Sequence, residues 1–315
     1  MTDPTGDDRL LLSGDGSVVT VGVMDSVHLG HQEILRHCRE TADAKDLPVI
    51  AVTFDPHPAK VLGGPDAIKM IYPADERVDH LLSYGADQVL VQEFTREFAA
   101  IEPDAWAHAL LVEALEARHL VVGYDFRFGK GAKGDVALLR RLGDEHGFTV
   151  EEVEALRLHG DIVSSSKIRR MIEGGEMTIA RELMGAPYYV RGRVVEGAKR
   201  GRNLGFPTVN LRTKWELLPM RGVYAGIAVV DEAFYVAGVN VGTNPTFGDE
   251  GVRVEAHLDA FDGDLYGRDV AIHFLRRLRD ETKFESVDAL KAQMADDMDR
   301  ARTIVGDETD LELRP

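Results

Sequence analysis

The sequence predicts two domains: an N-terminal α/β domain with a doubly wound parallel sheet, and a C-terminal antiparallel β-barrel followed by a helix. A chain of 315 residues suits two domains of roughly 100–200 residues each. Up to about residue 185, short β-branched runs alternate with amphipathic helical stretches. After Pro187, strand patterns follow one another without helices. We therefore expect domains at residues 17–185 and 186–305, between a flexible N-terminus (1–16) and a C-terminal tail (306–315).

The elements of the first domain alternate in type. Strands are expected at residues 18–23, 49–54, 88–91 and 120–122. Helices are expected at residues 30–45, after Pro73, near Pro103, and between Asp135, an N-cap residue, and Gly147, a helix-stop residue. Strands separated by helices imply a parallel sheet that is covered on both faces. Such sheets bind ligands at the carboxyl ends of their strands.

The second domain is a series of strands. They are expected at residues 190–195, 209–211, 223–230, 234–239, 252–258 and 270–274. Turn formers separate them, including Asp231-Glu232 and residues 262–264. Consecutive strands without helices indicate an antiparallel sheet or small barrel. One helix is expected after them, at about residues 286–304.

Composition excludes several classes of protein. The formal net charge of −17 repels polyanions, which argues against a DNA- or RNA-binding protein but not against small phosphate ligands. No apolar run approaches the roughly 18 residues of a membrane span, and the acidic N-terminus does not resemble a secretion signal. Cys38 is the only cysteine, so a reducing cytoplasm is the expected location.

The most informative stretch is residues 21–31, where a strand runs into a turn and a helix opens with two histidines. His28 and His31 are three residues apart, so both imidazoles lie on one helical face. The first helical turn also presents unpaired N–H groups that suit phosphate, and Gly30 allows a close approach of a nucleotide. Two alternatives are surface decoration and half of a metal site, although no third ligand follows at metal-binding spacing.

Three further segments place polar groups where strands end or helices begin. Residues 53–58 end the second strand with Asp55 and His57, and residues 123–129 end a later strand with Asp125 and Arg127. Residues 164–169 open a helix with hydroxyl caps and two cations, a favourable arrangement for an anion. Together, these segments favour a phosphate site at one edge of the sheet.

Residues 129–134 match the dinucleotide-binding pattern G-x-G-x-x-G, with Glu154 twenty residues further on. This match would predict an NAD-dependent oxidoreductase. Three residues, however, intervene between the strand and the glycines, and the unit is not the first βαβ of its sheet. We therefore interpret the segment as a mobile glycine-rich loop beside the nucleotide.

The second domain has no P-loop, so a kinase site there must hold phosphates differently. Residues 197–205 form a cationic glycine-rich loop that leads into Thr208 and Asn210, which share one strand face and offer hard oxygen atoms suited to Mg²⁺. Downstream, residues 253–257 alternate, with Arg253, Glu255 and His257 on one face. A solvated strand face would show the same alternation.

The first half resembles the nucleotidyltransferase domain of bacterial bifunctional riboflavin kinase/FMN adenylyltransferases, also called FAD synthetases. The resemblance rests on residues 22–31 (GVMDSVHLGH), 53–58 (TFDPHP), 123–129 (GYDFRFG) and 163–169 (VSSSKIR). It implies a nucleotidyltransferase-like Rossmann fold. It also implies that catalytic His28 and His31 hold ATP phosphates, and that Ser164, Ser165 and Arg169 close over them. The other implied contacts are Gly22, Gly30, Asp125 and Arg127 for ATP, and Asp55, His57 and Arg127 for the flavin.

The second half resembles the riboflavin kinase domain of the same family. Residues 201–210 match its GxxxGxPTAN-like segment, with Val209 in place of Ala, and residues 255–258 (EAHL) precede a DLYG turn at residues 264–267. The resemblance implies that Glu255 is the catalytic base. It further implies that Gly201, Gly205, Thr208 and Asn210 bind ATP, the last two together with Mg²⁺.

The resemblance implies two reactions, which need ATP as co-substrate and Mg²⁺. The C-terminal domain would phosphorylate riboflavin to FMN, and the N-terminal domain would adenylylate FMN to FAD with release of pyrophosphate. The expected partners are the small molecules riboflavin, FMN and ATP, with no nucleic acid and no membrane, and homo-oligomerisation is left open.

Two residues depart from the family pattern: Met24 replaces Phe, and Ser26 replaces Gly. If the turn needs a positive φ at Ser26, a side chain there costs about 1 kcal/mol. One alternative is therefore a riboflavin kinase with an impaired adenylyltransferase site. An alternative of another class is a non-catalytic flavin-sensing protein.

Overall fold

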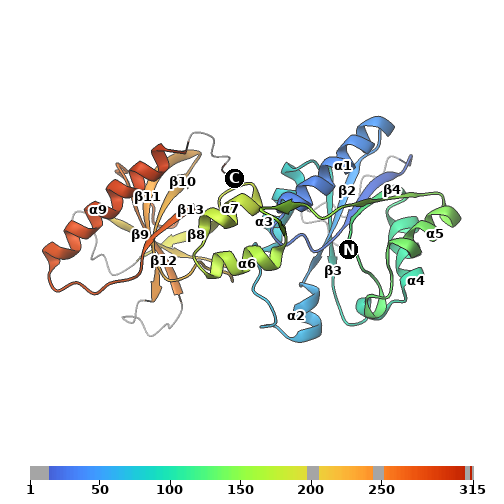
Figure 1. Ribbon diagram of the computed structural model, residues 1–315, viewed down its shortest axis with the longest axis horizontal. Coiled ribbons are helices and arrows are strands. Elements are labelled where there is room, and N and C mark those ends of the chain that lie inside the picture. Colours follow the sequence, from blue (N-terminus) through green and yellow to red (C-terminus); the bar gives the residue numbers. More distant parts are fainter. Residues whose placement is uncertain (1–13, 197–205, 244–251, 309–312, 314–315) are drawn as a thin grey trace. The chain divides into compact units, whose positions relative to one another are not determined.

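A computed structural model describes residues 14–196, 206–243, 252–308 and 313. The chain forms two compact units, Met1–Ser165 and Ser166–Pro315. The sheet of the first unit has five parallel strands in the order β3-β2-β1-β4-β5 (Figure 1). Their bounds are Ser17–Val21 (β1), Val49–Asp55 (β2), Gln88–Glu93 (β3), Ala117–Gly123 (β4) and Thr149–Val153 (β5). The predicted parallel sheet is confirmed, and β5 is a strand that the sequence patterns did not indicate.

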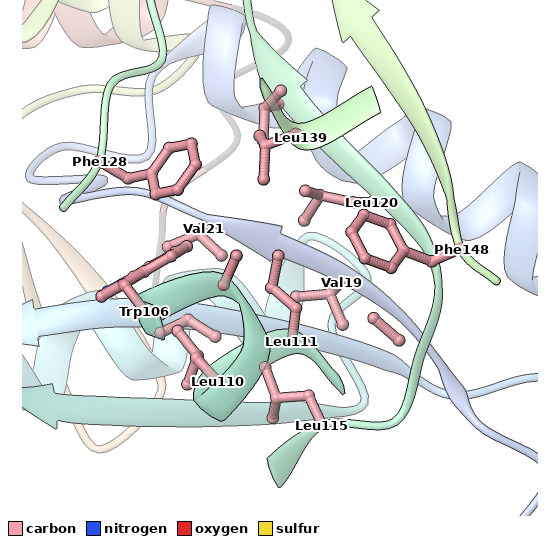
Figure 2. Close-up of a cluster of buried hydrophobic side chains, with 14 of the residues drawn as sticks. Val19, Val21, Trp106, Leu110, Leu111, Leu115, Leu120, Phe128, Leu139 and Phe148 are labelled. Carbon is pink, nitrogen blue, oxygen red and sulfur yellow. The ribbon is translucent and has the colours of Figure 1, made fainter. Parts of the chain in front are cut away.

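Helices cover both faces of this sheet, so it is doubly wound as predicted. They are α1 (Leu29–Lys45), α3 (Ala74–Ser83), α4 (Pro103–Ala107) with its π-helical continuation His108–Ala114, and α5 (Val136–His146). The short helix α2 (Pro58–Gly63) follows β2 and has no buried residue. Alternate β1 side chains point to opposite faces. Val19 and Val21 join a core with side chains of α4 and α5 (Figure 2), whereas Val18 packs with Leu35 of α1 and Leu81 of α3.

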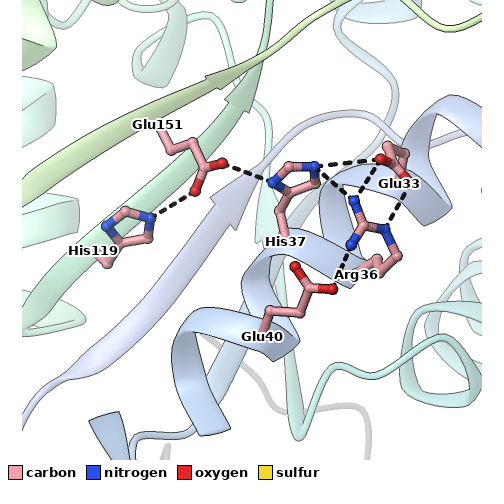
Figure 3. Close-up of polar contacts among 6 residues, drawn as sticks. All are labelled: Glu33, Arg36, His37, Glu40, His119 and Glu151. Atoms are coloured by element: carbon pink, nitrogen blue, oxygen red, sulfur yellow. Dashed lines mark hydrogen bonds and ion pairs between the residues drawn. The ribbon is translucent and has the colours of Figure 1, made fainter. Parts of the chain in front are cut away.

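A polar network also fastens α1 to the sheet, on the solvent side of this packing (Figure 3). His37 of α1 contacts Glu151 of β5, with 2.7 Å between Nδ1 and Oε1. The other oxygen of Glu151 lies 3.2 Å from His119 Nε2 on β4. Arg36 forms ion pairs with Glu33 and Glu40 on the same helix. The network holds the middle of α1 in place, and therefore also the start of the helix, where the two histidines lie.

The second unit contains a closed barrel with strand order β10-β11-β12-β9-β8-β13, which confirms the predicted barrel. The bounds are Tyr189–Val195 (β8), Thr208–Arg212 (β9), Gly222–Val230 (β10), Ala233–Thr243 (β11), Val252–Leu258 (β12) and Asp269–Arg279 (β13). Asp231 and Glu232 form the β10–β11 turn with φ of 44° and 70°, values typical of a tight hairpin turn.

The final helix α9 (Val287–Gly306) packs on the outside of the barrel. Ser286 caps it by accepting a hydrogen bond from Ala289 N, and Ala301 and Ile304 pack against β10 and β13. Asp297, which is buried, accepts hydrogen bonds from both Nε and Nη2 of Arg279 at the end of β13. An apolar contact and a buried ion pair therefore fix this helix to the barrel.

Helices α6 (Ser165–Glu173) and α7 (Met177–Met184) precede the barrel, and α7 packs on β13. They fall mainly within the second compact unit, so the boundary after residue 185 stays a prediction. The predicted flexible N-terminus lies mostly outside the described residues. Within the described part of the chain, no helix combines the length and apolar character needed to cross a membrane.

Candidate active sites

The first candidate site lies at the switch point of the parallel sheet. From β1, the chain runs outward to β2 and β3 on one side, while β4 and β5 lie on the other. Loops that leave the carboxyl ends of β1 and β4 therefore diverge, and ligands of such sheets generally bind at this switch point. The loop after β1 ends at His28, and His31 follows in the first turn of α1, while the loop after β4 carries Asp125 and Arg127.

The two histidines at the start of α1 stack on each other. Their ring centroids are 3.7 Å apart, with 13° between the ring planes. His28 is the N-cap residue of α1, and its Nδ1 accepts a hydrogen bond from His31 N at 3.3 Å. His28 is buried, which disfavours surface decoration. Among the described residues, no group of three or more His, Cys, Asp or Glu side chains could hold a metal.

Gly30 is required by this arrangement. A β-carbon built on it would lie 3.2 Å from two atoms of the His28 ring, closer than ordinary van der Waals contact. Gly30 therefore leaves room for the capping imidazole. Gly22, at the end of β1, donates a hydrogen bond to Val52 O and keeps the turn attached to β2.

His31 is neutral at physiological pH. Burial lowers its pKa well below the usual value, and the neighbouring His28 lowers it further. Its Nδ1 is buried and has no hydrogen-bond partner in the described structure. Buried polar atoms are rarely left unpaired, so this nitrogen suits a group that arrives with a ligand.

Ser26 does not carry the backbone strain that was considered for it. The positive φ values of this turn fall on Met24 (50°) and Val27 (42°). Both side chains are buried in the core between α1 and the sheet. Their apolar packing offsets the free-energy cost of the positive φ values. Ser26 is buried, and its Oγ lies 3.3 Å from Ser165 Oγ at the start of α6. The departure from glycine therefore connects the turn between β1 and α1 (residues 22–28, the histidine turn) to a predicted phosphate-binding serine.

The remaining predicted residues of this site lie on neighbouring loops. Asp55 ends β2 and is exposed, and His57 caps α2 through a 2.9 Å hydrogen bond from Ala59 N to its Nδ1. Asp125 and Arg127 follow β4 and are exposed. Ser164 precedes α6 and Arg169 lies within it. The roles of these residues stay predictions.

The G-x-G-x-x-G segment has a structural explanation. Gly129 has φ of 66°, and a β-carbon on it would lie 2.7 Å from Pro103 Cα. A β-carbon on Gly134 would lie 2.6 Å from the Phe128 ring, and these two residues form an antiparallel bridge. The glycines thus close a tight loop after β4, and the geometry gives no support to the dinucleotide interpretation.

Cys38 is not a candidate nucleophile. It is buried on α1, and burial raises its pKa to about 12, with a further contribution from Glu151. Because the thiolate is the reactive form, a thiol with such a pKa is unreactive at neutral pH.

The second candidate site is a row of polar side chains across three strands of the barrel. Glu255 on β12 is in register with Asn210 on β9 and with Asn240 on β11. Thr208 Oγ1 donates a 2.6 Å hydrogen bond to Glu255 Oε1. The predicted residues Thr208, Asn210 and Glu255 are therefore brought together, and Asn240 is a member of the row that the sequence did not indicate.

This row lies on the outer face of the barrel. The alternate residues of β12, Val254, Ala256 and Leu258, are buried in the interior. Asn210 is also buried and Glu255 is half-buried, although both point outward. A fully solvated strand face would leave both exposed, so the geometry favours a site over that alternative.

His257 holds the segment that enters this site. Its Nδ1 donates a hydrogen bond to Pro207 O at 2.8 Å, since a carbonyl can only accept, and its ring meets Phe206 edge-on. The contact fixes the start of β9, and therefore Thr208. Gly201 and Gly205, predicted to bind ATP, lie outside the described residues.

Comparison with known proteins places both units in described families. Residues 12–167 match the family model for FAD synthetase, and residues 184–305 match that for riboflavin kinase. The chain is 35% identical over 293 residues to the bifunctional riboflavin kinase/FMN adenylyltransferase of Escherichia coli K12, covering 93% of this chain and 94% of that protein. The chain belongs to the bifunctional riboflavin kinase/FMN adenylyltransferase family.

Two further similar proteins align with nearly the whole chain. The Bacillus subtilis 168 protein of the same name is 34% identical over 291 residues, or 90% of this chain and 91% of that protein. A solved structure from Streptococcus pneumoniae, described as a macrolide-efflux protein, is 33% identical. The structural match covers 92% of this chain and 95% of the Streptococcus pneumoniae chain, with a TM-score of 0.85.

Proposed function

We propose that this chain phosphorylates riboflavin to FMN on the outer face of its barrel. We propose further that it adenylylates FMN to FAD at the carboxyl ends of the central strands of its parallel sheet. The observation that carries the proposal is the contrast between the two sites. One contains a carboxylate hydrogen-bonded to a threonine, and the other contains stacked imidazoles at a helix start. Phosphorylation of riboflavin and adenylylation of FMN need different catalytic groups.

Phosphorylation of riboflavin needs a base. The primary hydroxyl of riboflavin attacks the γ-phosphorus of ATP, its proton passes to Glu255, and ADP leaves. General base catalysis of this kind typically contributes about 10²–10⁴-fold. Glu255 Oε1 accepts from Thr208, so Oε2 is the oxygen we assign to the substrate hydroxyl.

The donors beside Glu255 fit Mg²⁺. Thr208 and Asn210 offer hydroxyl and amide oxygens, and Mg²⁺ in kinases takes few protein ligands, with phosphates and water completing its shell. When bound there, Mg²⁺ neutralises charge on the ATP phosphates. Thr208 and Asn210 are the residues that would hold it, and Gly201 and Gly205 are assigned to the phosphate-binding loop.

Adenylylation of FMN needs no base, because the attacking phosphate of FMN is already anionic. It attacks the α-phosphorus of ATP, and pyrophosphate leaves. The difficulty is the meeting of two polyanions, which N–H donors and cations relieve. We assign His28, His31 and the N-terminus of α1 to the ATP phosphates. We further assign Gly22, Gly30 and Asp125 to the ATP site, and Asp55 and His57 to the flavin site. Arg127 could contact either substrate. The residues assigned to close over the phosphates are Ser164, Ser165 and Arg169.

The proposal is tested by incubating the purified chain with riboflavin, ATP and Mg²⁺ and separating the flavin products over time. We expect FMN to appear first and FAD to follow, with one pyrophosphate per FAD. FMN without FAD would indicate a riboflavin kinase only. Riboflavin binding without turnover would indicate a flavin-sensing protein.

We also propose a cytoplasmic location. Whether the chain forms a homo-oligomer is tested by sedimentation of the purified chain.

A further inference from the structure

Arg77 of α3 is a cation buried beneath the loops of the first site. Its side chain is fully buried, an unusual position for arginine. Burial lowers its pKa, while the charges of Asp25, Asp55 and Asp75 act in the opposite direction. Arginine stays protonated in proteins, so the structure keeps a positive charge beneath the carboxyl ends of β1 and β2.

The donors of Arg77 are directed at three consecutive residues that end β2. Nη1 donates to Thr53 Oγ1 at 2.9 Å and to Phe54 O at 3.2 Å. Nη2 donates to Phe54 O at 3.1 Å and lies 3.5 Å from Asp55 Oδ1. This last contact is an ion pair between the buried guanidinium and the half-exposed Asp55 carboxylate.

The same guanidinium reaches the histidine turn. Nη1 donates to Val23 O at 2.9 Å, and Thr53 Oγ1 donates to that carbonyl at 2.7 Å. Arg77, Thr53 and Val23 therefore form a closed set of hydrogen bonds. The set joins the loop after β1, which leads into His28 and His31, to the end of β2, which carries Asp55.

A core role alone does not explain this arrangement. An apolar residue would fill the space under the strands without the cost of burying a charge, which is high unless the charge is hydrogen-bonded. The guanidinium instead binds two backbone carbonyls, that of Val23 after β1 and that of Phe54 near the end of β2. Its planar, forked donors are suited to fixing several acceptors in one geometry.

We infer that Arg77 is a positioning residue for FMN adenylylation, because it holds the histidine turn and the Thr53–Asp55 strand end in the relative geometry that ATP and FMN require. The donors on Nη1 and Nη2 face protein acceptors, so Arg77 acts through these segments and does not touch the substrates. The inference rests on the proposed function of the first site.

The test compares Arg77→Met, which nearly preserves volume, and Arg77→Lys, which preserves charge but not the fork, with wild type. Each variant is assayed for both reactions at a temperature well below its own melting transition. Leu142→Ala, a buried change on α5, serves as a control that lowers stability without touching Val23, Thr53 or Asp55. Misplacement by about 1 Å costs on the order of 100-fold in rate.

We expect Arg77→Met to lose about 100-fold in kcat/KM for FMN adenylylation, and Arg77→Lys to recover part of that loss. The KM for FMN should rise more than the KM for ATP, because α1 also anchors the histidine turn. Riboflavin phosphorylation by the same preparation should stay within about twofold, and Leu142→Ala should keep both activities.

Adenylylation by Arg77→Met within about threefold of wild type, or an equal loss in Leu142→Ala, would overturn the inference. If Arg77→Met does not fold, Thr53→Val decides: it removes one shared hydroxyl and should lose about tenfold in adenylylation alone. An unchanged Thr53→Val would then contradict the inference. A wild-type chain that makes no FAD from FMN would contradict the proposed function instead.

Discussion

The hydroxyl of Thr208 donates a 2.6 Å hydrogen bond to Oε1 of Glu255, across the pairing of β9 with β12. This contact has two consequences for the proposed kinase site. It fixes the rotamer of the carboxylate, and it occupies one of its two oxygens. The other oxygen is then the acceptor for the proton of the substrate hydroxyl.

Thr208→Val should lower kcat/KM for riboflavin phosphorylation by about 10- to 100-fold, because a hydrogen bond to a charged group is worth roughly 1.5–3 kcal/mol. Thr208→Ser keeps the hydroxyl and should retain most of the activity. Steady-state kinetics with riboflavin and Mg-ATP measure both. Unchanged activity in Thr208→Val would contradict the role of the hydroxyl, and so would a loss in Thr208→Ser equal to that in Thr208→Val.

The histidine pair should be needed for FAD synthesis alone. Replacement of both His28 and His31 by Ala removes the donors that we assign to the ATP phosphates, and it removes the cap of α1. We expect FAD formation from FMN to fall by at least about 100-fold, while FMN formation from riboflavin persists. The measurement is separation of flavins by chromatography, and undiminished FAD synthesis would remove the phosphate role from these residues.

The lowered pKa of His31 predicts a pH dependence of stability. Between its folded pKa and its unfolded value of about 6.5, His31 is neutral when folded but protonated when unfolded. The unfolded state then binds more protons, so the free energy of unfolding falls as pH decreases below about 6.5, by at most about 1.4 kcal/mol per pH unit. Denaturant titrations from pH 8 to 5 measure this slope, which His31→Gln should reduce. An equal slope in that variant would assign the effect to other groups.

The buried pair between α9 and β13 should contribute more to stability than the exposed pair on the same helix. Asp297→Ala leaves Arg279 without its bidentate partner and should destabilise by about 3 kcal/mol. Arg302 pairs with Asp259 with 48% of its side chain exposed, so Arg302→Ala should cost much less than Asp297→Ala. Thermal or denaturant unfolding of the two variants tests the order, and equal costs would contradict it.

Much of this structure was predictable, because many strands of both units contain β-branched runs and α5 has a clear cap at Asp135. The stacking of His28 and His31 also follows from their spacing. β5 was missed because its sequence, TVEEV, carries two acids on an edge strand. Short polar edge strands lack the apolar pattern that identifies central ones.

Other features depend on contacts that no local pattern contains. Arg77 lies in a helix rich in charged residues, so a sequence pattern predicts an exposed side chain there. Its hydrogen-bond acceptors are brought together only when β1 pairs with β2. Asn240 joins the Glu255 row through strand register, which requires the pairing of β11 with β12. The positive φ values fall on Met24 and Val27 and not on Ser26, because packing of their side chains determines the path of that turn.

The division of labour between the two units is tested most directly by the Glu255→Ala variant, assayed separately with riboflavin and with FMN. The account predicts that FMN formation from riboflavin is abolished, while the same preparation still converts FMN to FAD at close to the wild-type rate. Loss of both conversions, or continued phosphorylation of riboflavin, would contradict it.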